Sequence, residues 1–190
     1  MRGGMSGFYK RTRGFALIIA LIMLLILTIL GVLAVRVVAL EEKMAGNVYD
    51  RDLALQAAEA ALRVGEAVAE AQSKSSTPNS GFPSYTDADA ACPSGAINNC
   101  VGGLCSKPDK DCPERWQRSD FTGWVDASVA LGSLAGNAPQ YYVEHLGSDF
   151  PCNDGGASDP KNCNRYRITA RSNPGSGRAT VMLQSVYATD

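Results

Sequence analysis

A long uncharged and strongly apolar run constrains this chain more than any other feature. From Phe15 to Val35 no residue carries a charge, and the run directly follows the basic residues Lys10, Arg11 and Arg13. A helix needs about 20 apolar residues to span a bilayer, whereas the apolar core of a secretory signal has about 7–15 and precedes a cleavage site between small residues. The positive-inside rule keeps the basic end in the cytoplasm. We therefore predict an inner-membrane helix, with the rest of the chain outside the cytoplasm.

The helix is expected to continue beyond the membrane. Residues 40–72 contain no proline and are rich in Ala, Leu, Glu and Arg, which are strong helix formers. Val48, Leu55 and Leu62 recur every seven residues and form a narrow apolar stripe. This recurrence also fits a coiled coil, but the many alanines nearby favour packing under a sheet. We expect these three residues to pack against the globular head, which is the part of the chain after the helix.

These patterns divide the chain into a helix and one small head. The helix is expected over 15–72, with a transmembrane half at 15–35 and an amphipathic half at 36–72. Ser, Pro and Gly residues end it and begin a cysteine-containing loop region at 73–122. The predicted fold class is α+β: a long N-terminal helix packed against a C-terminal antiparallel sheet at 123–190, with disulfide-stapled loops.

The sheet is predicted from four segments that are rich in β-branched and aromatic residues. They are 123–131, 140–146, 165–172 and 179–188. In the third segment Tyr166, Ile168 and Ala170 alternate with Arg and Thr residues, so apolar side chains share one face. We expect that face to lie against the helix and the other face to be in water.

All six cysteines follow the apolar run, where the compartment is oxidising. An even number there predicts a disulfide framework of up to three bridges, although the sequence does not choose among the possible pairings. Cys152 with Cys163 is the favoured pair, because these two lie far from the other four and a stretch of loop character separates them. The six are Cys92, Cys100, Cys105, Cys112, Cys152 and Cys163.

No cofactor, metal or catalytic site is expected. The cysteines at 92–112 could form a zinc site, but they contain no C-x-x-C pair and His145 is the only histidine in the chain. The loop at 152–159 could bind calcium through oxygen ligands, but it lacks the alternating acids of an EF-hand. No phosphate-binding loop or nucleophile elbow is present, and His145 has no evident nucleophile beside it, so we predict that the chain is not an enzyme.

The junction between basic and apolar residues resembles the start of type IV pilins. In that family a short basic leader ends in Gly, the next residue is usually Phe, and a dedicated prepilin peptidase cuts between them and leaves the helix on the product. Gly14 and Phe15 fit this pattern. The resemblance implies a leader at 1–14, or at 5–14 if translation starts at Met5, with cleavage after Gly14 and N-methylation of Phe15. An uncleaved single-span anchor is the alternative that the apolar run alone supports.

Stretches at both ends of the chain resemble the PilX minor pilins of type IV pilus assembly. They are 40–47 and 50–63 in the helix, of which 56–61 is the most specific part, and 166–171 and 181–188 in the last two predicted strands. The cysteine-containing middle of the chain carries no such resemblance. A disulfide-bridged loop near the C-terminus is common in pilins, and Cys152 with Cys163 would occupy that place.

Ile19 departs from the wider pilin family. Most pilins have Glu at this position of the membrane helix, where it is thought to pair with the N-terminal amine of a neighbouring subunit, because an unpaired carboxylate in hydrocarbon is costly. Ile19 cannot form that pair. A subunit at the extreme tip has no subunit ahead of it and needs no such carboxylate, so the departure implies a tip position.

The resemblance implies a non-catalytic minor pilin that primes pilus assembly, lies at or near the tip and supports attachment and twitching motility. Its partners would be other minor pilins, the major pilin, a tip adhesin, the prepilin peptidase and the inner-membrane assembly platform. The head would be periplasmic before assembly and on the cell surface afterwards. Removal of a leader with four basic residues leaves the chain more acidic than its net charge of −1, so no nucleic-acid partner is expected.

Three alternatives remain open from the sequence. A type II secretion pseudopilin is the nearest, since the tip subunit of that group also lacks the Glu, although the stretch at 56–63 argues against it. A DNA-uptake minor pilin would require a basic face on the head. A permanently anchored binding module would show no processing at Gly14.

Overall fold

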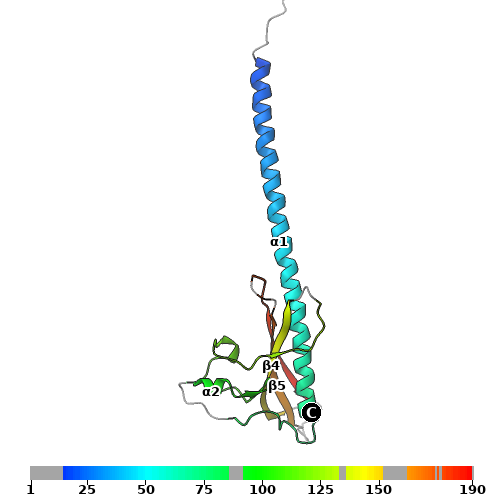
Figure 1. The fold of residues 1–190 in the computed structure, drawn as a ribbon, viewed down its shortest axis with the longest axis vertical. Coiled ribbons are helices and arrows are strands. Elements are labelled where there is room, and N and C mark those ends of the chain that lie inside the picture. The colour runs from blue at the N-terminus through cyan, green and yellow to red at the C-terminus, as the bar shows by residue number, and fades with distance from the viewer. Residues whose placement is uncertain are drawn as a thin grey trace, which may run out of the picture. The chain divides into compact units, whose positions relative to one another are not determined.

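The structure is a computed structural model that describes residues 15–85, 92–132, 136–151, 162–173, 175 and 177–189. It divides into two compact units, Met1–Asn47 and Val48–Asp190. Figure 1 shows the ribbon, with α1, α2, β4 and β5 labelled.

Helix α1 spans Phe15–Ser73, which confirms the long helix expected from the sequence. In the first unit its described side chains are exposed, and most of them are large and apolar. Among the described helices, α1 is the one long and apolar enough to cross a membrane. Its backbone N–H and C=O groups bond within the helix, so the apolar surface can enter lipid without exposing unpaired polar groups.

The second unit adds a six-stranded sheet to the last part of α1. The strands are β1 (Cys100–Val101), β2 (Leu104–Cys105), β3 (Val125–Asp126), β4 (Asn137–Pro151), β5 (Asn162–Asn173) and β6 (Met182–Thr189). The short helix α2 (Ser94–Ile97) precedes β1, and the short helix η1 (Arg115–Gln117) lies between β2 and β3. The order is β1-β2-β4-β5-β6, with β3 paired to β4. All pairs are antiparallel except β2 with β4, which is parallel. The expected antiparallel sheet is therefore a mixed sheet.

Strands β4 and β5 are longer than the sequence pattern indicated. They form one antiparallel pair from Asn137↔Asn173 to Pro151↔Asn162, with register shifts on both sides of Gly147. Gly147 has φ 143°, a conformation that glycine adopts at no steric cost, so the ladder passes an irregularity instead of ending there. Segment 123–131 is shorter than expected, with only Val125 and Asp126 in β3.

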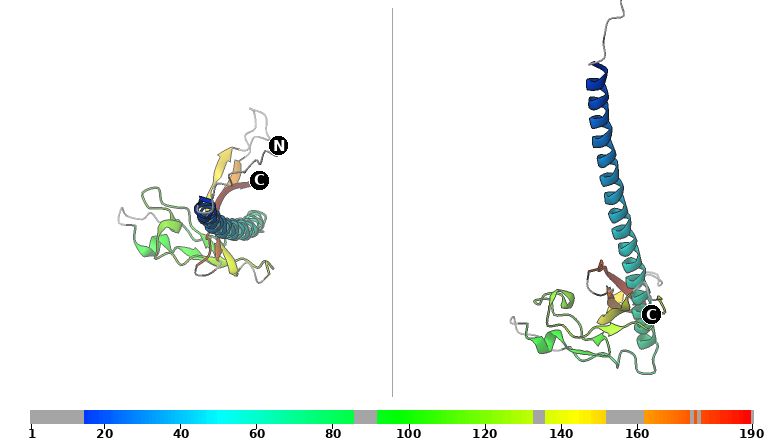
Figure 2. Two further views of the ribbon diagram at one scale, coloured as in Figure 1. Left: turned by 90° about the horizontal axis from the view of Figure 1, so that it is seen from above. Right: turned by 45° about the horizontal axis from the view of Figure 1, so that its top comes forward.

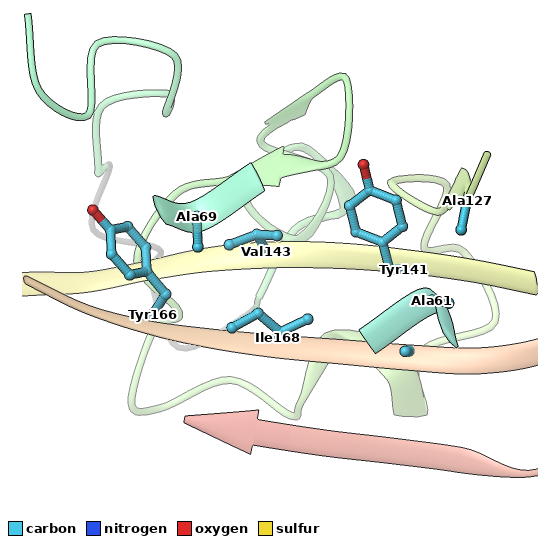
Figure 3. Packing of buried hydrophobic residues seen from close by; sticks show 8 residues of the cluster. Ala61, Ala69, Ala127, Tyr141, Val143, Tyr166 and Ile168 are labelled. Atoms are coloured by element: carbon cyan, nitrogen blue, oxygen red, sulfur yellow. The ribbon is translucent and has the colours of Figure 1, made fainter. Parts of the chain in front are cut away.

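The main core lies between α1 and one face of the sheet (Figure 3). Tyr141 and Val143 of β4 and Tyr166 and Ile168 of β5 project toward the helix, where they meet Ala61 and Ala69. The alternation predicted for β5 is confirmed, since Tyr166, Ile168 and Ala170 are fully buried. The sheet side thus supplies the large side chains of this core, and the helix side supplies small ones.

The helix face that contacts the sheet differs from the predicted stripe. Val48 is 61% exposed and Leu55 37% exposed, whereas Leu62 packs against the core. The buried positions of α1 are instead small residues: Ala54, Ala57, Ala58, Ala61, Gly65, Ala69 and Ser73. A helix can approach a sheet closely only where its side chains are small. The prediction was therefore wrong for Val48 and Leu55, because size decided the buried face and the seven-residue recurrence did not.

The second face of the sheet is covered over β4, whereas the side chains of β6 on that face, such as Val186, are exposed. The segment with α2, drawn green, lies across the sheet from the last part of α1 (Figures 1 and 2). It forms a second core in which Cys92, Ile97, Cys105 and Phe121 pack on Tyr142 of β4. The expectation of a solvated face, which rested on the alternation in β5 alone, was therefore wrong over β4 and holds only at β6.

Candidate functional site

The helix start is the first candidate site. Phe15 is the first described residue of α1, and the first turn contains no acidic residue. Gly14 lies outside the described residues, so cleavage after it stays a prediction. The first four N–H groups of an α-helix have no partner within the helix, and they form the positive end of the helix dipole. The helix start thus attracts a carboxylate that the chain itself does not supply there.

Ile19 lies one turn into α1 and is exposed. Its aliphatic side chain can contact lipid or another apolar helix, but it cannot accept a hydrogen bond from an amine. The neighbouring described side chains on α1 are apolar as well. The first turn of the helix therefore offers no carboxylate of its own.

Two disulfides close the loops that cover the outer face of the sheet, which is the face turned away from α1. Cys92 pairs with Cys112 across 20 residues of chain, and Cys100 pairs with Cys105 across 5. All four cysteines of the alternative zinc site are therefore consumed, and no cluster of metal-binding side chains occurs within the described ranges. Loop closure predicts a stabilisation of about 3 kcal/mol for the larger ring and about 2 kcal/mol for the smaller one.

Cys163 is also disulfide-bonded. Its expected partner, Cys152, lies outside the described residues, and so does the whole loop at 152–159 that is the calcium alternative. The pairing of Cys152 with Cys163 stays a prediction.

A buried ion network joins the stapled segment to the sheet. Glu144 of β4 is fully buried, and its carboxylate pairs with Arg115 of η1 and with Arg167 of β5, the latter at 2.6 Å. Arg167 also pairs with Glu114 at 2.7 Å. Arg115 donates further hydrogen bonds to the Ile97 carbonyl, at 2.9 Å, and to the Ser106 hydroxyl.

The charges in this network stabilise one another. Burial lowers the pKa of Arg167, but the hydrogen bond and the attraction of Glu144, together with Glu114, outweigh it and raise the pKa above its ordinary value. Burial, with the nearby Glu144 charge, raises the pKa of Tyr142. Arg167 therefore stays charged. Removal of either arginine would leave a poorly compensated carboxylate in the interior.

The larger disulfide holds this network in place. Cys112 lies three residues before Arg115, so the bridge to Cys92 anchors the turn that carries Glu114 and Arg115. A cavity of about 30 Å³ lies beside it, lined in part by Pro108, Cys112 and Arg115, with room for one or two water molecules. The arrangement is that of a structural clamp, which fixes the loops on the sheet.

Sequence reasoning missed this network, although one signal was available. Glu144 interrupts a strand of aromatic and β-branched residues and lies on the same face of it as Tyr142. A carboxylate on a face with a buried aromatic predicts a buried cationic partner. Which of the many arginines would provide that partner could not be read from the pattern.

Two family models match the chain. Residues 13–63 match the model described as PilX N-terminal. Residues 101–189 match the model described as Type IV pilus assembly protein PilX C-term. This chain belongs to the PilX family of type IV pilus assembly proteins. Comparisons with curated proteins and with solved structures found no significant match.

The two PilX matches agree with the structural elements. The first begins at the junction of basic and apolar residues and ends within α1, and the second runs from β1 to the end of β6. Cys92 lies in neither match, whereas its partner Cys112 lies in the second. The larger disulfide therefore ties a segment outside the matched regions to the PilX head.

Proposed function

We propose that this PilX-family chain is a minor pilin that primes assembly of the type IV pilus and lies at or near its tip. The observation that carries the proposal is Ile19 in a helix start without any acid. Such a subunit can accept the carboxylate of a following subunit at its own amino end, but it offers none to a subunit ahead. A chain with that asymmetry is suited to the leading end of a fibre.

The proposal includes processing and location. The prepilin peptidase cuts after Gly14, Phe15 is N-methylated, and α1 stays in the inner membrane with the head in the periplasm until assembly. The partners are other minor pilins, the major pilin below and an adhesin at the tip, so the subunit serves attachment and motility without catalysis of its own. The clamp of disulfides and buried charges supports this role because it keeps the exported head rigid.

Processing is tested by replacement of Gly14. A bulky residue at this position should leave a full-length membrane-held precursor and few pili, whereas Gly14→Ala is a mild control. N-terminal sequencing and mass measurement of the protein in sheared pili report the cut and the methyl group. Normal maturation of the bulky variant would show that the chain is not handled as a pilin.

The tip position is tested with Ile19. Deletion of the chain should sharply reduce the number of surface pili. Ile19→Glu should have a mild or a harmful effect on their number, because function does not require a Glu at this position. Quantitative mass spectrometry should find far fewer copies than of the major pilin, and immunogold should label fibre ends. Uniform labelling along the shaft would overturn the tip assignment, and loss of secretion with normal pili would instead favour a pseudopilin.

A further inference from the structure

Strand β6 lies at one end of the sheet order and has an open edge. It pairs with β5 in unbroken register from Asn164↔Thr189 to Arg171↔Met182. In the part of the chain that the structure describes, no strand pairs with its other side. We propose that this edge binds an extended segment of a partner protein, which adds a strand to the sheet and carries apolar side chains on one face and basic side chains on the other. The proposal concerns the head alone and does not depend on the tip position.

The pairing pattern shows which backbone groups are open. The Ser172 N–H donates to the Val181 carbonyl at 2.9 Å, and the Val181 N–H donates to the Ser172 hydroxyl, so the backbone groups of these two residues face each other. In an antiparallel ladder such pairs alternate with pairs whose N–H and C=O groups point away from the partner strand. In β6 the backbone N–H and C=O groups that point away from β5 belong to Met182, Gln184, Val186 and Ala188. They form a row of donors and acceptors at strand spacing.

This edge has none of the usual protection against strand addition. Natural edge strands are kept short, or carry charges, proline or a bulge. Strand β6 has eight residues, Met-Leu-Gln-Ser-Val-Tyr-Ala-Thr, without a charge or a proline, and its register has no shift. The strand at the opposite end of the order, β1, has only two residues. One edge of the sheet is therefore too short to pair with much of an added strand, whereas the edge at β6 is long enough to do so.

Two exposed apolar side chains lie on the outer face at the edge, on either side of Gln184. Met182 is 38% exposed and Val186 62% exposed, and both project from β6 on the side away from α1. The exposed Trp116 of η1 forms a shallow groove with Thr169 and Met182. A strand added to β6 would place alternate side chains next to Met182 and Val186, where apolar residues would bury this surface.

The face toward α1 is acidic. The Ser185 hydroxyl donates to the Glu66 carboxylate at 3.0 Å, which places that charge beside the edge strand. Glu66 takes part in none of the ion pairs among the described residues, whereas the next acid along, Glu70, pairs with Lys74. An added strand with Lys or Arg on this face would supply the missing cation.

The same charge argues against a second copy of this chain as the occupant. Two β6 strands that paired about a twofold axis would bring both Glu66 carboxylates to the same side of the joined sheet without a cation. A partner segment that alternates apolar and basic residues satisfies the backbone, the apolar face and Glu66 together.

Synthetic peptides test the proposal with the full-length protein in zwitterionic lipid nanodiscs. The probe is a labelled eight-residue peptide that alternates Val and Lys, and its control alternates Val and Glu. Fluorescence anisotropy, corrected with empty nanodiscs, should show at least tenfold tighter binding of the basic peptide. Two further peptides carry N-methyl groups on the backbone nitrogens, one at every Val and the other at every Lys. One of the two should lose binding and the other should keep it, because only alternate backbone N–H groups point toward β6. Equal binding of the two methylated peptides, or no binding of the basic peptide, would overturn the proposal.

Variants of the protein locate the site. Val186→Pro removes an outward N–H and should weaken peptide binding at least tenfold with little change in melting temperature, while Val186→Thr keeps the N–H and should retain most binding. Glu66→Gln should reduce the preference for the basic peptide several-fold. If Val186→Pro does not fold, the methylated peptides on the unaltered protein still decide. Self-association of the full chain that Val186→Pro abolishes, without peptide binding, would mean a second copy and refute the partner proposed.

Discussion

Replacement of Gly65 by Ala tests the closeness of α1 to the sheet, with two opposing effects on stability. A Cβ built at Gly65 would lie 2.5 Å from Cγ2 of Ile168 and 3.2 Å from Cδ2 of Tyr141. Ordinary carbon contacts are about 3.5–4.0 Å, so the helix or Ile168 must move by roughly 1 Å. Such overpacking costs about 1–3 kcal/mol, whereas Gly→Ala in a helix gains about 1 kcal/mol. We expect a net loss of about 1 kcal/mol, because both neighbours belong to the core.

The assay is thermal unfolding of the full-length protein in detergent, followed by tryptophan fluorescence of the head. Gly46→Ala is the matched control on the same helix, since nothing lies within 4 Å of its added Cβ. That control should leave the stability of the head unchanged or raise it by up to about 1 kcal/mol. In an Ile168→Ala background the cost of Gly65→Ala should largely disappear, because the clashing methyl is gone. A stabilising Gly65→Ala with no coupling to Ile168 would refute the close approach.

Three further predictions concern the head. Arg115→Ala should destabilise it by about 3 kcal/mol in the same assay, because buried Glu144 then keeps only one guanidinium, while Arg→Ala at an exposed site should have little effect. The native exported protein should show no free thiols, and replacement of the Cys92 and Cys112 pair by Ser should cost about 2–5 kcal/mol; titratable thiols in unreduced protein would contradict the framework. Burial lowers the pKa of His145 in the folded protein, so the His145 ring binds a proton more readily in the unfolded chain than in the folded one. Stability should therefore fall as pH decreases below about 6.5, and His145→Gln should flatten the dependence of melting temperature on pH.

The long apolar helix and the main strands β4, β5 and β6 could be predicted from local sequence patterns alone. The apolar run after a basic cluster has no other favourable environment than lipid or a helix bundle, and the helix formers that follow continue the same helix to Ser73. The alternation in β5 identified its buried face, since side chains on a strand can point only to two sides. These features are local, so a pattern of neighbouring residues is enough to define them.

The tertiary structure decided which helix residues are buried. The apolar stripe through Val48 and Leu55 was the stronger pattern, but the sheet packs on the alanines and on Gly65. The reason is steric: large residues such as Tyr141 and Ile168 already fill the space from the sheet side, so only small residues fit opposite. The volume on the far side of a contact is not contained in the helix sequence.

The structure also decided what covers the outer face of the sheet. Cysteine count and compartment predicted bridges, but the pairing of Cys92 with Cys112 and the placement of Arg115 against Glu144 depend on where a loop without periodicity returns to the sheet. Long-range pairings of this kind are chosen by the whole fold, because the cost of closing a loop changes only slowly with its length. The sequence therefore limited the possible partners, and the packed head selected among them.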